Sequence, residues 1–288
     1  MSVISKKQKL TPDQLIKYKQ NQQKISMLTC YDYSFACIAN QSDVDLLLVG
    51  DSGVMTLLGH PDTTHANVEM MSMMTKAVAF GAPDKFIIAD MPFLSHRQGI
   101  SHAVQCADKL IKAGANAIKI EGIDGHQEVI SHLTQSGIPV MGHLGLTPQS
   151  VHSLGYKVQG KTFDQAQKIK QQALDLQHLG CFSIVLECVP DQLAKEIAEL
   201  LDIVVIGIGA GAFVDGQVLV LQDMLGMTQH MKPKFVRHFL DGFSCIQAAF
   251  NQYHQAVQSG TYPTNQESYT LDISNHKQSK TPKEVVSA

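Results

Sequence analysis

The stretch FIIADMPFLSHRQGISHAVQCADKLIKAGANAIKIE, which spans Phe86–Glu121, decides the fold class. It begins with a short apolar run, continues through a segment with helical spacing at His102–Ala113, and ends with a second apolar run at Ala117–Ile120. Short apolar runs without alternation are typical of strands that are buried on both faces. A strand, a helix and a second strand in this order predict a βαβ unit of a parallel sheet.

Further apolar runs bring the number of expected strands to eight. Working outward from the first pair, they lie at Ser26–Cys30, Leu46–Gly50, Ile138–Met141, Phe182–Leu186, Ile203–Ile208 and Val218–Leu221. Eight strands that alternate with helices favour a closed (β/α)8 barrel, the TIM barrel of the α/β class, over an open doubly wound sheet. We expect one such domain.

Helical spacing separates most of these runs. We expect helices at Val68–Phe80, at Phe163–Leu179, from an N-cap at Asp191 to about residue 201, and from about Pro233 to Val257. Residues 1–262 are expected to form the barrel with an N-terminal helical extension. Residues 263–288 are polar and are expected to form a mobile tail.

Composition excludes several classes of protein. The chain has 288 residues, 44% of them hydrophobic, and 23 Lys and Arg against 26 Asp and Glu. This balance argues against a disordered chain and a globally basic nucleic-acid binder. The apolar run Ile203–Val214 is shorter than the ~20 residues that cross a bilayer, so no membrane association is expected. The six cysteines form no C-x-x-C pair, which favours a cytoplasmic enzyme with reduced thiols.

The segment Gly207–Ala212 fits the G-x-G-x-x-[GA] pattern of dinucleotide-binding turns. That pattern requires a following helix, but a new apolar run begins at Val218. We therefore interpret the segment as a glycine-rich turn at the mouth of the barrel.

Acidic residues follow four of the expected strands. They are Asp51, Asp90, Glu121 and Glu187. Because all strands of a (β/α)8 barrel open onto one face at their carboxyl ends, the four acids are expected to converge there. Converging carboxylates repel one another unless a cation, a proton or a basic side chain lies between them. Oxygen ligands without clustered Cys or His favour Mg²⁺ or Mn²⁺ over zinc.

Two basic side chains belong to the same end of the barrel. Lys119 lies two residues before Glu121, so both point to the same face of their strand. A cation at this place suits stabilisation of an enolate oxygen or a carboxylate. A plain ion pair between the two residues stays an alternative. His143 follows the fifth strand and is a candidate for proton transfer or hydrogen bonding, or a structural histidine.

Six blocks of sequence, in order along the chain, resemble the ketopantoate hydroxymethyltransferase (3-methyl-2-oxobutanoate hydroxymethyltransferase) family. They are Val49–Ser52, Ala89–Phe93, Ile118–Gly122, Gly142–Ser150 (GHLGLTPQS), Leu186–Pro190, and Gly207–Gly211 with Asp215–Gln217. The resemblance implies a (β/α)8 barrel assembled as a homo-oligomer, a decamer of two pentameric rings. It implies transfer of a hydroxymethyl group from 5,10-methylenetetrahydrofolate to 3-methyl-2-oxobutanoate (2-oxoisovalerate). The product is 2-dehydropantoate, formed through a Mg²⁺-stabilised enolate in pantothenate biosynthesis.

The resemblance also implies roles for individual residues. Asp51 and Asp90 would ligate Mg²⁺, and Glu121 would complete the metal site directly or through water. The oxo acid would be bound at Asp51, Ser52, Asp90 and Lys119.

The implied catalytic residues are Glu187, Lys119 and His143. Glu187 would take the C3 proton, and His143 would support the bound substrate. Two alternatives stay open: a metal-dependent aldolase or lyase acting on a related 2-oxo acid, and a catalytically silent binding barrel. Departures from the family pattern at Gly53–Val54, His65–Val68 and Met74 motivate the second alternative.

Overall fold

The computed structural model describes residues 9–228 and 233–270. The chain divides into two compact units, residues 1–240 and residues 241–288. Residues 271–288 of the expected tail lie outside the described ranges. The expected limits of the barrel domain and of its tail, at residues 262 and 263, stay a prediction.

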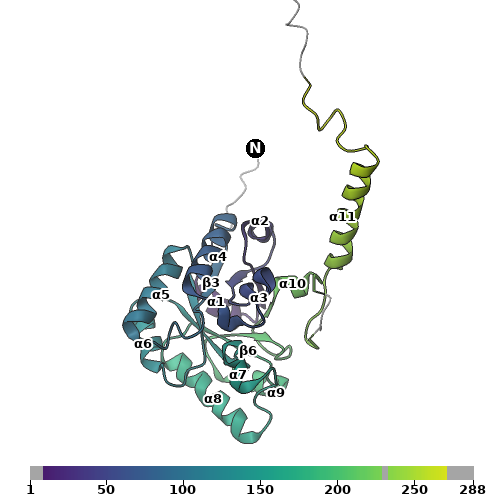
Figure 1. The fold of residues 1–288 in the computed structure, drawn as a ribbon. Helices are drawn as coiled ribbons and strands as arrows, with labels where there is room; N and C mark the ends of the chain where they lie inside the picture. The colour runs from purple at the N-terminus through teal and green to yellow at the C-terminus, as the bar shows by residue number, and fades with distance from the viewer. Residues whose placement is uncertain (1–8, 229–232, 271–288) are drawn as a thin grey trace, which may run out of the picture. The chain divides into compact units, whose positions relative to one another are not determined.

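In the first unit, eight parallel strands close into a barrel in sequence order, which confirms the predicted fold (Figure 1). Each strand pairs with its neighbours along the chain, and β1 pairs with β8 to close the ring. The strands are β1 Ile25–Thr29, β2 Leu46–Val49, β3 Phe86–Asp90, β4 Ala117–Glu121, β5 Val140–Gly145, β6 Ser183–Glu187, β7 Val204–Ile208 and β8 Gly216–Leu219.

Helices α4, α5, α6 and α8 surround the strands in Figure 1. The helices of the first unit are α1 Pro12–Gln20, α2 Tyr33–Gln41, α3 Gly53–Leu58, α4 Val68–Gly81, α5 Ile100–Lys112, α6 Gln127–Gln135, α7 Val151–Leu154, α8 Phe163–His178, α9 Asp191–Leu200 and α10 Leu221–Met224, with 3₁₀ turns η1 Thr63–His65 and η2 Pro148–Ser150. The expected N-cap of α9 is displaced by one residue: Pro190 occupies the cap, and Asp191 is the first helical residue.

The second unit contains helix α11, Gly242–Gln258. The sequence predicted that this helix begins near Pro233. That prediction is wrong, because the helix begins at Gly242. The side chain of Asp241 accepts the backbone N–H of Ser244 and so caps the helix at this point. Before it, the N–H of Phe239 is bonded to the carbonyl of Met224, a long-range bond that a continuous helix would exclude.

Alternation along the strands separates an apolar interior from a polar mouth. Phe86 and Ile88 point into the barrel, and the next residue on the same face is Asp90. Ala117 is followed on its face by Lys119 and Glu121 in the same way. The apolar interior is formed by residues from all eight strands: Ile25, Met27, Leu46, Leu48, Phe86, Ile88, Ala117, Met141, Val185, Val204, Ile206 and Val218.

Helix α1 covers the amino-terminal end of the barrel. Leu15 is fully buried in the same apolar cluster as the first residues of the strands. Lys19 fixes the helix by donating from Nζ to the carbonyls of Ala198 (2.8 Å) and Ile203 (3.0 Å) and to the carboxylate of Asp215 (2.8 Å). The end of the barrel opposite the strand-end acids is therefore filled by the chain itself.

The glycine-rich segment after β7 is a turn, as predicted. Gly209 and Gly211 have φ values of +64° and +78°, and no helix lies between β7 and β8. A Cβ on Gly211 would lie 2.4 Å from the Cβ of Asp191, so the turn and helix α9 touch through this glycine. The geometry excludes the strand–turn–helix arrangement that binds dinucleotides.

Two further properties concern the described residues. No helix among residues 9–228 and 233–270 is long and apolar enough to span a membrane. All six cysteines are free thiols.

Candidate functional site

The carboxyl ends of β3 to β6 bring five ionisable side chains to one end of the barrel. Strand pairing sets Asp90 opposite Lys119 and Glu121 opposite His143. Glu187 ends β6, the next strand around the ring. Strand β5 continues beyond the predicted end to Gly145, so His143 lies within the strand and not after it. The acids Asp90, Glu121 and Glu187 likewise are the last residues of their strands.

Lys119 is the cation that offsets the converging acids. Its side chain is only 5% exposed, and its Nζ lies 3.0 Å from Asp90 Oδ1 and 3.9 Å from Glu121 Oε1. Burial by itself would lower the pKa of Lys119, but the charges of Asp90, Glu121 and Asp51 raise it above its ordinary value. Lys119 forms an ion pair with Glu121, as in the plain alternative, but its nearest carboxylate is that of Asp90.

Asp51 joins the cluster from the turn after β2. Its backbone N–H donates to Asp90 Oδ2 at 3.1 Å, and its side chain is buried. Burial, together with the charges of Asp90 and Glu121, raises the pKa of Asp51 well above its ordinary value. Burial also raises the pKa of Asp90, against the opposing effect of Lys119. The ionised forms of both carboxyls are therefore disfavoured by their surroundings.

His143 lies between two carboxylates. Its Nδ1 is 3.2 Å from Glu121 Oε1, and its Nε2 is 3.2 Å from Glu187 Oε2 in a contact that lacks hydrogen-bond alignment. Burial and Lys119 oppose protonation of the imidazole, but Glu121 and the contacts with both carboxylates raise the pKa of His143 to about 9. Nδ1 also lies 3.3 Å from Lys119 Nζ. A protonated ring presents Nδ1–H to Glu121, and Lys119 then cannot donate to the same nitrogen.

Glu121 and Glu187 differ in environment. Despite burial, His143 and Lys119 lower the pKa of Glu121, whose side chain is 4% exposed. The Glu187 side chain is 17% exposed, against 3% for Asp90. Glu187 is therefore the acid of the cluster that a substrate reaches from the mouth of the barrel.

Gln149 is a buried residue of the site that the strand-end pattern did not indicate. Its backbone N–H donates to Glu121 Oε2 at 3.0 Å, and its Nε2 donates to Asp51 Oδ2 at 2.8 Å and to the carbonyl of Met91 at 2.9 Å. It lies in η2, within the GHLGLTPQS block that carried the resemblance. The GHLGLTPQS block is thus the sequence feature that could have indicated Gln149.

Ser52, a predicted substrate-binding residue, has a partner that sequence reasoning also missed. Its Oγ is 2.9 Å from the hydroxyl of Tyr31, which is almost fully buried. Tyr31 lies after β1 and Ser52 is the N-cap residue of α3, so this bond holds two βα loops together beside Asp51.

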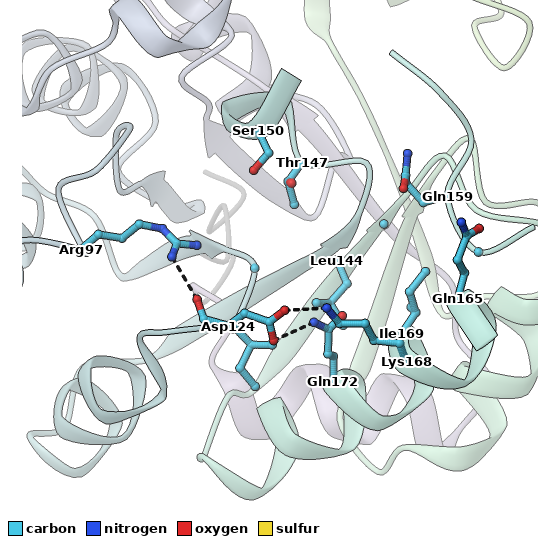
Figure 2. A pocket seen from close by; sticks show the side chains of 14 residues that line it. Arg97, Asp124, Leu144, Thr147, Ser150, Gln159, Gln165, Lys168, Ile169 and Gln172 are labelled. Carbon is cyan, nitrogen blue, oxygen red and sulfur yellow. Dashed lines mark hydrogen bonds and ion pairs between the residues drawn. The ribbon is translucent and has the colours of Figure 1, made fainter. Parts of the chain in front are cut away.

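A cavity of about 270 Å³ lies beside this end of the barrel, between the loop after β4, the end of β5 and helix α8. Figure 2 shows Lys168 and Gln172 of α8 both directed at the carboxylate of Asp124, at 2.8 Å and 3.0 Å. Arg97 reaches the main-chain carbonyl of Asp124 from the other side, at 3.0 Å (Figure 2). The wall of this cavity combines polar and apolar side chains, and its one carboxylate is paired with Lys168.

Gly145 fixes the backbone on which Glu187 is placed. Its φ is +91°, and a Cβ there would lie 2.2 Å from the carbonyl oxygen of Glu187. We expect Gly145→Ala to lower the free energy of unfolding by about 3 kcal/mol or more, because strain and a backbone clash add. Gly137→Ala is the matched control, since Gly137 has φ +83° but open space around it. Unfolding in urea measures the free energy of unfolding of both variants. Equal losses of about 1 kcal/mol in the two variants would contradict the clash at Gly145.

Comparison with known proteins decides the family. The family model described as ketopantoate hydroxymethyltransferase matches residues 9–265. The chain belongs to this family. The sequence resemblance is thereby confirmed over most of the chain.

Individual relatives of the ketopantoate hydroxymethyltransferase family agree. The chain is 56% identical over 253 residues to a 3-methyl-2-oxobutanoate hydroxymethyltransferase of Bdellovibrio bacteriovorus, covering 88% of this chain and 96% of that protein. It is 50% identical over 254 residues to the enzyme of that name from Francisella tularensis subsp. novicida, covering 88% and 96%. The Legionella pneumophila protein of that name is 52% identical over 253 residues, covering 87% and 97%.

Solved structures confirm the fold of this family member. A 2,3-dimethylmalate lyase of the PEP mutase/isocitrate lyase superfamily has a TM-score of 0.58 at 14% identity, covering 89% of this chain and 90% of the other. A phosphoenolpyruvate phosphomutase from Streptomyces platensis subsp. rosaceus has a TM-score of 0.60 at 10% identity, covering 87% and 88%. At this identity the likeness concerns the barrel alone.

Proposed function

We propose that this chain transfers a hydroxymethyl group from 5,10-methylenetetrahydrofolate to 3-methyl-2-oxobutanoate, giving 2-dehydropantoate in pantothenate biosynthesis. The observation that carries the proposal is the position of Glu187, the partly exposed carboxylate at the edge of a buried cluster of acids and cations. Proton abstraction next to a carbonyl requires a base that the substrate can reach and a positive charge near the developing enolate oxygen. Glu187 at the mouth of the barrel and the buried Lys119 match these two requirements. The names of the relatives supply the substrates.

Each side chain then has a defined part in the reaction. Lys119 and Ser52 bind the carboxylate of the oxo acid, and Glu187 takes the proton from C3. Positive charge on Lys119 and on protonated His143 stabilises the enolate that forms. Water adds to the methylene carbon of the donor as one carbon–nitrogen bond breaks, and the second carbon–nitrogen bond then breaks, so that the carbon is released as formaldehyde and both folate nitrogens take a proton. C3 of the enolate adds to this carbon, and the resulting alkoxide takes the proton held by Glu187 to give the hydroxymethyl group.

The residues present fit a Mg²⁺ ion held by two carboxylates. Asp90 Oδ1 is buried without a hydrogen bond within the described part of the chain, although Lys119 lies at ion-pair distance. Mg²⁺ usually takes one or two carboxylates and completes its shell with water and substrate oxygens. Asp51 and Asp90 would hold the ion, and Glu121 would support it through water, since both Glu121 oxygens already have partners. The bound ion would polarise the keto oxygen of the substrate.

Among the residues that the structure describes, no three His, Cys, Asp or Glu side chains are arranged as a ready metal site. A site of two protein carboxylates that substrate and water complete needs no third protein ligand, and we propose Glu121 for the outer shell of the ion on that basis.

Gln149 orients Asp51, so its loss should weaken metal binding. We expect Gln149→Leu to reduce affinity for Mn²⁺, used as a probe for Mg²⁺, by about ten-fold or more, since residues that orient ligands have effects of this size. The bond to Asp51 Oδ2 is the one lost. Electron paramagnetic resonance of free Mn²⁺ measures the affinity, with Gln135→Leu on the exposed side of α6 as control. Unchanged affinity in Gln149→Leu would contradict this role.

Assembly and location are proposed on the resemblance. We propose a homo-oligomer, a decamer of two pentameric rings, in the cytoplasm. Sedimentation equilibrium of the full chain measures the assembly.

The test of the proposed function is proton exchange at C3 of 3-methyl-2-oxobutanoate in D₂O, followed by NMR. We expect exchange that depends on Mg²⁺, and formation of 2-dehydropantoate once methylenetetrahydrofolate is added. Exchange without that product would favour an aldolase or lyase that uses another electrophile. No exchange with any metal would overturn the proposed function and favour a silent barrel.

A further inference from the structure

A second cavity lies beside the cluster of acids. Its volume is about 390 Å³, and it is lined by residues of the segments 96–100 and 125–129. The first segment follows β3 and leads into α5, and the second follows β4 and leads into α6. The cavity therefore lies on the same face of the barrel as Asp90 and Glu121, between the loops that follow β3 and β4.

His96 lines this cavity with unused hydrogen-bonding capacity. The residue is 1% exposed, and neither ring nitrogen has a hydrogen-bond partner within the described residues. Its ring centroid lies 4.7 Å from that of His126. Burial, with the neighbouring His126 and Arg97, lowers the pKa of His96 to about 3, so the ring is neutral and retains one N–H. A buried polar group without a partner destabilises the fold, and a ligand that pairs with it would remove this cost.

Two helices begin at this cavity without a side-chain cap. The N-cap of α5 is Gly99 and that of α6 is His126, and neither side chain accepts a backbone N–H of its helix. The first turn of each helix therefore presents backbone N–H groups and the positive end of the helix dipole. Helix starts of this kind bind anions.

Arg97 adds a full positive charge. It forms no ion pair with a carboxylate of the described residues, and its guanidinium donates only to the main-chain carbonyl of Asp124. The Asp124 carboxylate is held instead by Lys168 and Gln172, as Figure 2 shows. Glu128, in the first turn of α6, is the acid that lines the cavity. Arg97 and two helix starts outweigh this one exposed carboxylate, so the cavity favours an anion.

We propose that this cavity binds a carboxylate from the glutamate tail of the one-carbon donor. The inference rests on the proposed function, because tetrahydrofolate carries its glutamate at the end of the molecule opposite to the reacting methylene group. The cation of the acid cluster, Lys119, is already assigned to the carboxylate of the oxo acid, so the tail requires a separate positive site on the same face. The cavity at His96 and Arg97 provides that site with N–H donors from these two side chains and from the first turns of α5 and α6.

Direct binding tests the proposal without turnover. Isothermal titration compares tetrahydrofolate triglutamate with tetrahydropteroate, which lacks glutamate. We expect the wild-type protein to bind the triglutamate about ten-fold more tightly or better, as charge-assisted hydrogen bonds contribute effects of this size. Arg97→Gln and His96→Phe should lose this preference. Lys168→Gln is the matched control, since it removes an equal charge from the neighbouring cavity and should keep the preference.

The outcomes separate the two proposals. Equal affinity of the wild type for both ligands, or a preference that survives Arg97→Gln, would overturn the assignment of the cavity to the tail. Inorganic phosphate that binds at the cavity without any effect of tail length would show a free phosphate as the ligand, and would overturn it too. Exchange at C3 needs no folate, so it reports on the proposed function independently; Arg97→Gln, which is exposed and leaves the core intact, should retain it.

Discussion

Glu187→Gln is expected to reduce C3 proton exchange of 3-methyl-2-oxobutanoate by about 100-fold or more, while the barrel stays folded. The substitution keeps the shape of the side chain but removes the carboxylate that takes the proton. The measurement is the rate of deuterium incorporation by NMR, with Mg²⁺ present and the folate donor absent. Because exchange precedes the folate step, a loss here isolates proton abstraction from hydroxymethyl transfer.

The control for this variant is Glu196→Gln. Glu196 forms a surface ion pair with Lys170 on the outside of the barrel, so its loss should leave exchange unchanged. Thermal unfolding of both variants should stay close to that of the wild type. A Glu187→Gln protein with full exchange activity would show that another group is the base.

The second large effect is expected from Lys119→Met. Removing the ammonium leaves the buried carboxylates of Asp90 and Asp51 without their cation, and breaking a buried pair in this way costs about 3–5 kcal/mol. Unfolding in urea at pH 8, with a chelator present, measures the loss. Lys109→Met, which breaks an exposed pair with Glu69, should cost under about 1 kcal/mol.

The loss in Lys119→Met should depend on pH in a defined direction. Without the cation, the folded-state pKa values of Asp51 and Asp90 rise further above their unfolded values. Carboxyls with raised pKa values stabilise the fold while they are protonated, and this contribution is lost as pH rises through the folded-state pKa. The loss in free energy of unfolding relative to the wild type should therefore be smaller at pH 5 than at pH 8. An equal loss at both pH values would contradict the role of Lys119 as the cation that offsets Asp51 and Asp90.

Much of this site could be predicted because strand geometry is regular. Apolar runs marked the strands, and a residue at the end of a barrel strand has only one face on which to lie. The period of two also predicted correctly that Lys119 and Glu121 point to one face. Which acid lies nearest to Lys119 could not be predicted, because the pairing of β3 with β4 decides it.

The unpredicted residues act through tertiary contacts. Gln149 reaches Asp51 from a loop that lies far along the chain, and no local spacing encodes this approach. The same holds for Tyr31, the partner of the predicted Ser52, and for His96, whose lack of partners is visible only in three dimensions. The start of α11 was missed because the bond from Phe239 to Met224 competes with helical propensity upstream of Asp241.

The closure at the amino-terminal end of the barrel has a consequence for biosynthesis. Lys19 bonds to Asp215, 196 residues later in the chain, and β1 pairs with β8 as well as with β2. On the ribosome, α1 and β1 emerge first but acquire these partners only after β8 has left the exit tunnel. Leu15 of the first helix therefore stays exposed to solvent during nearly the whole of translation. Closure of the barrel is a late step of folding. A nascent chain stalled before residue 216 should hold an open sheet whose two edges are the first strand and the seventh.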